Sequence, residues 1–201
     1  MIGYFSAKEM IESAQYIAPT RNFSGTIFNF CEDNAVVETG LFNKKTLRAY
    51  AKKNCNSKLM KEEESLFEEY KGGSQGDYSS NMTLKINNVV ECLAGFQESK
   101  RAVIMINSKN WHHYETDDAK CCRELHFYLD RTKVDEAYPP GWKLSCTGFF
   151  RAQAVDIMPK NFYFVYYVMN LIKEKLQSME LNVEIGNYTH FVTTLVATRN
   201  D

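Results

Sequence analysis

One segment near the C-terminal end constrains the fold more than any other part of this sequence. Residues 161–177 are apolar around most of a helical circumference until Lys173. A helix with this pattern is stable only when other elements surround it, so the segment predicts a buried core helix. The chain has 201 residues, which is enough to bury such a helix without disulfides or a metal. We therefore expect residues 1–201 to form one domain.

The rest of the chain mixes helical and strand patterns in an irregular order. Ser6 and Glu9 form a capping box, which predicts a helix that ends at about Tyr16. Because the order shows no regular βαβ alternation, we expect an α+β fold in which one large mixed or antiparallel sheet packs against the long buried helix. Other helices are predicted at 45–71 and 82–96, and strands at 25–31, 35–39, 101–107, 124–129, 143–151 and 182–198.

Polar or glycine-rich stretches connect these elements. Residues 32–34, 71–77 and 139–141 are predicted to be turns or loops. The glycine cluster does not match a phosphate-binding loop, because Gly76 is followed by Asp77 and not by Lys and Ser or Thr. The charged run 61–64 is expected to form a solvated helix face.

The charge balance argues against general binding to polyanions. The 24 Lys and Arg residues face 25 Asp and Glu residues, for a formal net charge of -1. A chain with this balance has no overall attraction to nucleic acid or to an acidic membrane, so any anion must meet a local basic site. No apolar run reaches the roughly 18 residues of a membrane span, and the start lacks the pattern of a secretory signal. We expect a cytoplasmic protein with no membrane and no nucleic-acid partner.

The six cysteines are expected to be reduced thiols. They lie in apolar runs without the spacing of a disulfide framework. The sequence contains no Cys-x-x-Cys pair, and its four histidines do not lie at metal-ligand spacing from the cysteines, so no metal site is expected.

Candidate functional residues occur at three places. Cys121 lies between Lys120 and the pair Cys122-Arg123, and neighbouring cations favour the nucleophilic thiolate. A buried structural cysteine pair at the start of a strand explains the same residues equally well.

The other two places carry arginines and an amide. Lys100 and Arg101 precede one predicted strand, and Arg151 ends another. Paired guanidinium nitrogens suit phosphate monoesters, although an isolated arginine is usually a surface residue. Asn161 follows Pro159, where it would serve either as a helix N-cap or as a side chain that reads the edge of a pyrimidine.

Taken in order, these segments resemble the thymidylate synthase and nucleotide hydroxymethylase family. Roughly the C-terminal half of the chain is covered, and near the N-terminus only Thr20-Arg21-Asn22 is similar to a family motif, Asp-Arg-Thr. The stretches that carry the resemblance are Ser99 to Ile106, Cys121 to Leu129 (family Cys-His-x-x-x-Gln-Phe-Tyr-Val), Lys143 to Cys146, Arg151-Ala-Gln153 (family Arg-Ser-x-Asp), Pro159-Lys-Asn161 (family Pro-x-Asn) and Val183 to Tyr188 (family Leu-Glu-x-Gly-Asp-Phe).

The resemblance implies a thymidylate synthase-like fold and a pyrimidine nucleoside monophosphate as substrate. Cys121 would add to C6 of the base, so that C5 can attack the methylene group of 5,10-methylenetetrahydrofolate. The substrate-binding residues implied are Arg21 and Arg151 for the 5′-phosphate, Gln153 beside them, Asn161 for the base, and Lys100 and Arg101, which would reach the partner's phosphate in a homodimer. An Asn at position 161 suits uracil, whereas Asp would favour cytosine.

Several family features are missing. Ala152 and Ala154 replace a phosphate-binding serine and an aspartate, although Asp156 lies two positions further on, and one residue is missing before Pro159. Cys122 stands where the family often has His, and His126 replaces a Gln. Val196-Ala-Thr198 stands where a ribose-binding His-x-Tyr is expected, and no C-terminal segment follows to close over folate. The helix that contains Thr46 and Tyr50 carries no match for the catalytic Glu.

The resemblance leads to two candidate functions, and a third interpretation assumes no relation to the family. The first is a folate-dependent C5 methyl- or hydroxymethyltransferase of a nucleotide similar to deoxyuridylate. The alternative is a non-catalytic homodimer with the same fold that serves as a nucleotide-binding or protein-interaction module. The retained Cys121, Arg101, Arg151 and Asn161 favour binding, whereas the missing Glu, His and Tyr favour lost or altered chemistry. An unrelated α+β domain with a chance likeness is the third interpretation.

Overall fold

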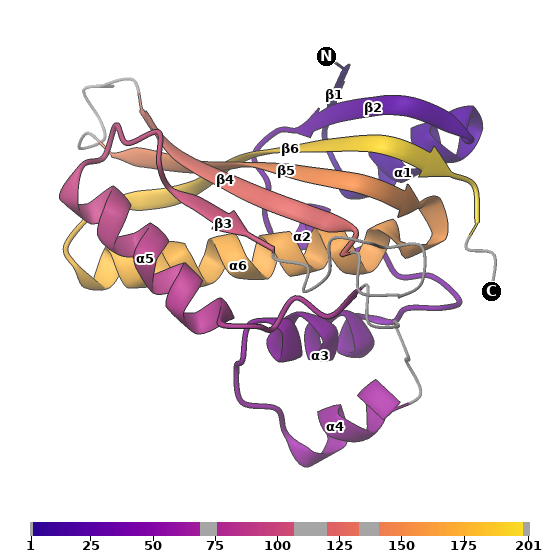
Figure 1. The fold of residues 1–201 in the computed structure, drawn as a ribbon, viewed down its shortest axis with the longest axis horizontal. Helices are drawn as coiled ribbons and strands as arrows, with labels where there is room; N and C mark the ends of the chain where they lie inside the picture. Colours follow the sequence, from indigo (N-terminus) through magenta and orange to yellow (C-terminus); the bar gives the residue numbers. More distant parts are fainter. Residues whose placement is uncertain (1, 69–75, 107–119, 133–140, 199–201) are drawn as a thin grey trace.

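The computed structural model describes residues 2–68, 76–106, 120–132 and 141–198, and Figure 1 shows how they are arranged. Six strands form one mixed sheet in the order β1-β2-β6-β5-β4-β3, which agrees with the expected α+β class. The elements in chain order are β1 (Ile2–Tyr4), α1 (Ala7–Ile17), β2 (Thr20–Ile27), α2 (Glu32–Ala35), α3 (Lys44–Asn54), α4 (Lys61–Glu68), α5 (Met82–Gly95), β3 (Val103–Met105), β4 (Cys122–Arg131), β5 (Trp142–Ala154), the 3-10 turn η2 (Val155–Ile157), α6 (Met158–Ser178) and β6 (Val183–Val196).

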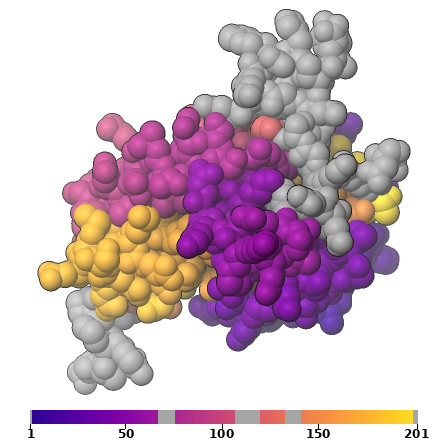
Figure 2. Space-filling view, turned by 90° about the horizontal axis from the view of Figure 1, so that it is seen from below, coloured from indigo at the N-terminus to yellow at the C-terminus, as the bar shows by residue number. Residues whose placement is uncertain are grey.

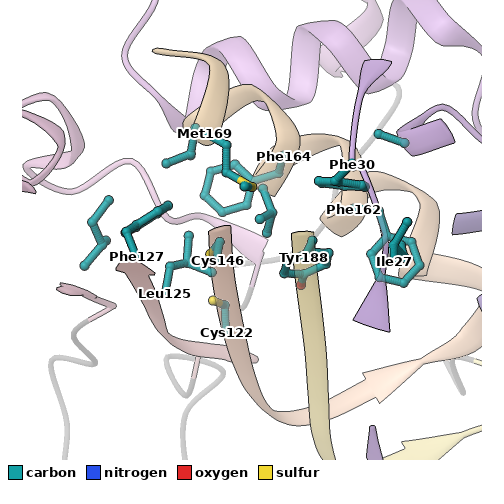
Figure 3. Close-up of a cluster of buried hydrophobic side chains, with 14 of the residues drawn as sticks. Ile27, Phe30, Cys122, Leu125, Phe127, Cys146, Phe162, Phe164, Met169 and Tyr188 are labelled. Carbon is teal, nitrogen blue, oxygen red and sulfur yellow. The ribbon is translucent and has the colours of Figure 1, made fainter. Parts of the chain in front are cut away.

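Helix α6 is the core helix that the apolar pattern predicts. Helices α3, α5 and α6 lie on one face of the sheet in Figure 1, and α6 contacts both β5 and β6 as well as α3 and α5. Figure 2 shows this side of the molecule, where the segments of α3 and α4 (purple) and α5 (magenta) form much of the surface. In the close-up of Figure 3, Phe162, Phe164 and Met169 of α6 lie against Cys146 and Tyr188 of the sheet. None of the described helices is both long enough and apolar enough to span a membrane.

Helix α6 begins three residues earlier than predicted. Its N-cap is Ile157, which makes no side-chain capping bond, and Pro159 lies at the start of the first turn, where a missing N–H costs nothing. The N-cap role considered for Asn161 is therefore wrong. Asn161 instead lies inside the helix with its side chain buried.

The first helix agrees with its pattern, but the predicted strand 25–31 overlaps only the end of β2, which stops at Ile27 because Asn29 adopts a left-handed backbone with φ of 48°. Ser6 accepts a bond from the Glu9 amide at 3.2 Å, and the Glu9 carboxylate accepts one from the Phe5 amide at 2.9 Å, so the N-terminal cap is formed. Strand β5 extends three residues beyond the predicted end, to Ala154. Most of the predicted loop 71–77, Asn107 and the two prolines at 139 and 140 lie outside the described residues.

The predicted strand at 35–39 is wrong. Residues 32–35 form the short helix α2 because the Asn34 side chain accepts a bond from the Cys31 amide at 2.8 Å, closing a helical turn in place of a strand connection. Val36 and Val37, which suggest a strand in the sequence, are packing residues outside the sheet. Val36 and Val37 are half-buried and pack against the hydrophobic clusters of the helical layer.

The helical stretch 45–71 is two helices, and its acidic run is not wholly solvated. The Lys52 ammonium lies 2.7 Å and 2.8 Å from the two carboxylate oxygens of Glu63, which is buried, and the Met60 amide donates to the same carboxylate at 2.8 Å. Burial alone would raise the pKa of Glu63, but these bonds and the charges of Lys52 and Arg48 lower it overall. The pair joins α4 to α3, so the interpretation of residues 61–64 as a solvated face fails at Glu63.

The strand connections bring four strand ends together. Strand β5 continues through η2 and α6 into β6, which pairs with β5 in parallel, whereas β4 and β2 run antiparallel to their neighbours β5 and β6. Thr20 at the start of β2 and Gln153 at the end of β5 both pair with Leu195, and Cys122 at the start of β4 pairs with Phe150. We call this place the strand-end region; it holds the start of β2, the start of β4, and the ends of β5 and β6.

One titratable side chain lies at the centre of the core. His190 is fully buried among the rings of Phe150, Phe162 and Tyr188, and its Nδ1 lies 2.6 Å from the Tyr188 hydroxyl. Burial lowers the pKa of His190 from 6.5 to about 3, so the imidazole is neutral in the folded protein.

This burial predicts a pH dependence of stability. Because the pKa is lowered in the folded state, the stabilisation is complete above the unfolded pKa of about 6.5 and is lost as the pH falls toward 3. We expect the free energy of unfolding to fall by up to about 1.4 kcal/mol per pH unit more in the wild type than in His190→Gln. Urea denaturation at pH 7, 6 and 5 measures this, and parallel pH profiles for the two proteins would contradict it.

Candidate functional site

Cys121 and Arg151 meet at the strand-end region. Cys121 directly precedes β4, and Arg151 lies near the end of β5. The Arg151 amide donates to the Cys121 carbonyl at 3.0 Å, and its guanidinium Nε donates to the Lys120 carbonyl at 3.3 Å. The structure therefore brings together two residues that the sequence singles out separately, and it holds the arginine side chain against the backbone beside the cysteine.

The two adjacent cysteines have different surroundings. Cys121 is half-buried, whereas Cys122 is fully buried and lies among core residues near Leu125 and Cys146 in Figure 3. Burial raises the pKa of Cys122, and the nearby Cys121 and Glu124 raise it further, so Cys122 is a poor nucleophile. The structural interpretation therefore applies to Cys122, and Cys121 is the less buried thiol of the two.

A pair of amides lies beside these residues. Asn161 in the first turns of α6 donates from Nδ2 to Oε1 of Gln153 at 2.6 Å, and Gln153 donates from Nε2 to the Ala154 carbonyl at 2.9 Å. Both side chains are buried. The Asn161 Oδ1 atom is buried and has no hydrogen-bond partner within the described part of the chain. An unpaired buried acceptor costs about 1–3 kcal/mol, so it marks a place where a donor from a ligand would be stabilised.

Sequence reasoning missed three residues near the cysteines. The Tyr78 hydroxyl accepts a bond from the Cys122 amide at 3.4 Å, and the Tyr50 hydroxyl of α3 donates to the Gly76 carbonyl at 2.8 Å. Lys160 is only 3% exposed, and its Nζ lies 4.9 Å from the centre of the Tyr50 ring. Lys160 interrupts an apolar helix and could have been noticed, but the tyrosines carry no local signal.

Both tyrosines are neutral phenols. Burial raises the pKa of Tyr50 well above its ordinary value, and the nearby Cys122, Cys121 and Asp77 raise it further. Burial likewise raises the pKa of Tyr78, with further contributions from Tyr50 and the two cysteines. Such phenols can donate or accept a hydrogen bond, but neither supplies a base near neutral pH.

Arg21 joins the same region, from the opposite side of β6. It pairs with Thr194 across β2 and β6, and its Nη1 donates to the Thr194 hydroxyl at 3.2 Å. Thr194 in turn pairs with Ala152, the residue after Arg151. Arg21 is exposed, so its guanidinium lies at the rim of the strand-end region.

Lys100 and Arg101 do not join this group. They precede β3 at the far edge of the sheet, where Val103 pairs with His126, five residues along β4 from Cys121. At about 3.3 Å per residue the separation exceeds roughly 15 Å. The Lys100 carbonyl lies 3.2 Å from Nε2 of His126, and both residues line a hollow of about 330 Å³.

The described residues contain no group of three or more His, Cys, Asp or Glu side chains that could hold a metal ion. None of the six cysteines is in a disulfide, which agrees with the predicted reduced thiols. No protein-family model matches the chain, and a search of the curated proteins finds no significant match.

The different surroundings of the cysteines predict an order of chemical reactivity. In the folded protein, iodoacetamide should modify Cys121 at least roughly tenfold faster than Cys122, Cys146 and Cys55, because burial raises the pKa of those three thiols. Peptide mass spectrometry after timed quenching measures each rate. The exposed Cys31 serves as the internal reference for a reactive thiol, and a urea-denatured sample should remove the differences. Equal rates for Cys121 and Cys122 in the folded protein would contradict this assignment.

Proposed function

We propose that this protein is a thymidylate synthase-like protein that binds a pyrimidine nucleoside monophosphate at the strand-end region and adds Cys121 to C6 of the base. The addition prepares C5 for methylation or hydroxymethylation. The observation that carries the proposal is a backbone hydrogen bond that holds the half-buried Cys121 beside Arg151, together with Gln153, two positions after Arg151, which binds Asn161 and its unpaired acceptor. These are the kinds of group that such a nucleotide needs for addition, phosphate binding and base recognition.

The chemistry suits a thiolate. The Cys121 thiol gives up its proton to solvent, its sulfur forms a bond to C6, and the electron pair of the C5–C6 double bond moves to C5, which becomes nucleophilic. Lys120 and Arg123 lie next to the cysteine pair in the sequence, and cations close to a thiol generally favour its thiolate. Arg151 and Arg21 supply guanidinium groups that match the oxygens of a 5′-phosphate.

The one-carbon donor rests on the resemblance alone. 5,10-Methylenetetrahydrofolate would supply the one-carbon unit that C5 attacks. The side chains described near the strand-end region, namely two tyrosines, an amide pair and a lysine, do not identify a folate site. The proposal therefore depends on nucleotide binding and on the cysteine addition.

A second function has its own supporting observation. The α3 residue that lies beside the cysteines is Tyr50, and its raised pKa makes it unsuitable as a base. A protein with this site can bind the nucleotide without completing transfer at C5. The second candidate is accordingly a non-catalytic nucleotide-binding homodimer with a thymidylate synthase-like fold.

Both candidates include a homodimer, and the sheet face that none of the described helices covers supports it. Phe149 alternates with the buried Phe150, so it projects away from the helices, and its ring stacks on Phe191 at 5.3 Å. On the edge strand β3, Met105 is 62% exposed beside the buried Ile104. Aromatic and methionine side chains on the outer face of a sheet are typical of a protein interface. Lys100 and Arg101 at the same edge would then be available to a partner's nucleotide.

A covalent adduct tests the proposed chemistry. Incubation with 5-fluoro-deoxyuridylate, with and without methylenetetrahydrofolate, should raise the intact mass of the protein by the mass of the nucleotide, or of nucleotide plus folate. The adduct that contains folate persists because, once C5 has attacked the methylene group, fluorine at C5 cannot leave as a proton does and the Cys121–C6 bond is not broken. Cys121→Ser should abolish the adduct, whereas the matched control Cys31→Ser, which changes an exposed cysteine, should leave it unchanged.

The same experiment separates the two candidates. Nucleotide binding without an adduct, and without tritium release from C5-labelled nucleotide, would contradict the enzymatic candidate. It would agree with the non-catalytic nucleotide-binding candidate. Failure to bind any pyrimidine nucleoside monophosphate in a calorimetric titration would remove both candidates.

The dimer proposal makes a separate prediction. Sedimentation velocity should show a dimer of the 23.3 kDa chain. Phe191→Lys should shift the protein to the monomer, because burying a lysine charge at the stacked pair of Phe149 and Phe191 is unfavourable. Tyr16→Lys is the control, since this α1 side chain is 92% exposed, and it should remain dimeric. A wild-type monomer at tens of micromolar would overturn the dimer.

A further inference from the structure

The amide pair at the strand-end region has a fixed hydrogen-bond direction. The Ala154 carbonyl can only accept, so Gln153 must turn its Nε2 toward it, at 2.9 Å. The Oε1 atom of Gln153 then faces Asn161 and must accept, which obliges Asn161 to present Nδ2, at 2.6 Å. A flipped Asn161 would place two oxygens against each other. One backbone carbonyl therefore decides which way the Asn161 amide points.

This direction matters because an amide can read either common pyrimidine. Uracil offers an acceptor at position 4 next to a donor at N3, whereas cytosine offers a donor at position 4 next to an acceptor at N3. An asparagine amide, with an acceptor oxygen beside a donor nitrogen, complements one base in one orientation and the other base after a 180° flip. A freely flipping asparagine in this place would accept both bases.

We propose that Gln153 is a positioning residue that makes the site discriminate between uracil and cytosine nucleotides by preventing the flip of Asn161. The inference rests on the proposed function, since it requires a pyrimidine nucleotide at this site. It also changes the role implied for Gln153, which acts through Asn161 and not by direct contact with the substrate.

We call this restraint of the Asn161 amide by Gln153 the lock. The surroundings of the two residues make their shared hydrogen bond rigid. Gln153 lies near the end of β5 and Asn161 in the first turns of α6, and the short turn η2 joins the two elements. Gln153 is 3% exposed and Asn161 is 2% exposed, so water does not compete for their shared hydrogen bond. The Asn161 Oδ1 atom is the one side-chain oxygen of the pair that lacks a partner among the described residues, and it is left to the ligand. A mismatched base would leave buried polar groups unpaired, which is where hydrogen bonding discriminates most strongly.

Calorimetric titration with deoxyuridylate and deoxycytidylate tests the lock. The wild type should bind one of the two nucleotides at least roughly tenfold more tightly. Gln153→Met keeps the size of the side chain and removes both hydrogen bonds, so the ratio of the two dissociation constants should fall to within about threefold. Gln153→Glu keeps an acceptor for Asn161 and should restore most of the ratio. Asn170→Ala, which changes a bond to Glu174 far along α6, serves as the control and should not move the ratio.

The outcomes distinguish a failure of the Gln153 proposal from a failure of the proposed nucleotide binding. A wild type that binds both nucleotides equally, or a Gln153→Met protein that binds with an unchanged ratio, would overturn the lock while leaving the nucleotide site in place. A wild type that binds neither nucleotide would remove the proposed function, and the lock with it. Because the readout is a ratio of two affinities within one protein, a general loss of stability in the variant does not imitate the expected result.

Discussion

The burial of α6 is the constraint on which the rest of this structure depends. An apolar surface that extends around a 21-residue helix must be covered on all sides. The sheet covers one side through β5 and β6, and α3 and α5 contact α6 on its other sides. Burying one large apolar side chain contributes about 1.5–3 kcal/mol, and α6 buries several, so the positions of both layers follow from this helix.

The site is a consequence of the same arrangement. Because β5 turns through η2 directly into α6, the last residues of β5 and the first residues of α6 are held together at one end of the sheet. The antiparallel neighbour β4 begins at that end and brings Cys121 beside Arg151. Polar groups are thus placed at the boundary of the core, where a hydrogen bond is stronger than in water and an unpaired group is costly.

The parts of the fold that were predictable from sequence are those set by local patterns. The capping box of Ser6 and Glu9, the periodicity of α5 and the apolar circumference of α6 each appear within a few turns of the chain. The residues 35–39 could not be placed, because valines on a strand and valines packed against helices look alike until the tertiary contacts are known. The burial of Glu63 could not be predicted for a similar reason, since its partner Lys52 lies in another helix.

The candidate site also contains some residues that local sequence identifies and others that only the tertiary packing reveals. Cys121, Arg151 and Asn161 stand out by residue type and by their order along the chain, and the structure places them at one end of the sheet. The tyrosines could not be anticipated, because Tyr50 on α3 and Tyr78 before α5 reach the cysteines only through the packing of the helical layer. The direction of the Gln153–Asn161 bond likewise depends on a backbone carbonyl that has no counterpart in the sequence pattern.

The pairing of β2 with β6 has a consequence for how this chain is made. Within the described strands, β2 contacts β1 and β6, and Thr20 finds its partner at Leu195. Contacts so far apart in sequence form late, because a long loop must close before they stabilise anything. During synthesis from the N-terminus, β2 therefore keeps an unpaired edge until β6 has also left the ribosome. During that time the unpaired edge of β2 is open to aggregation and to chaperones.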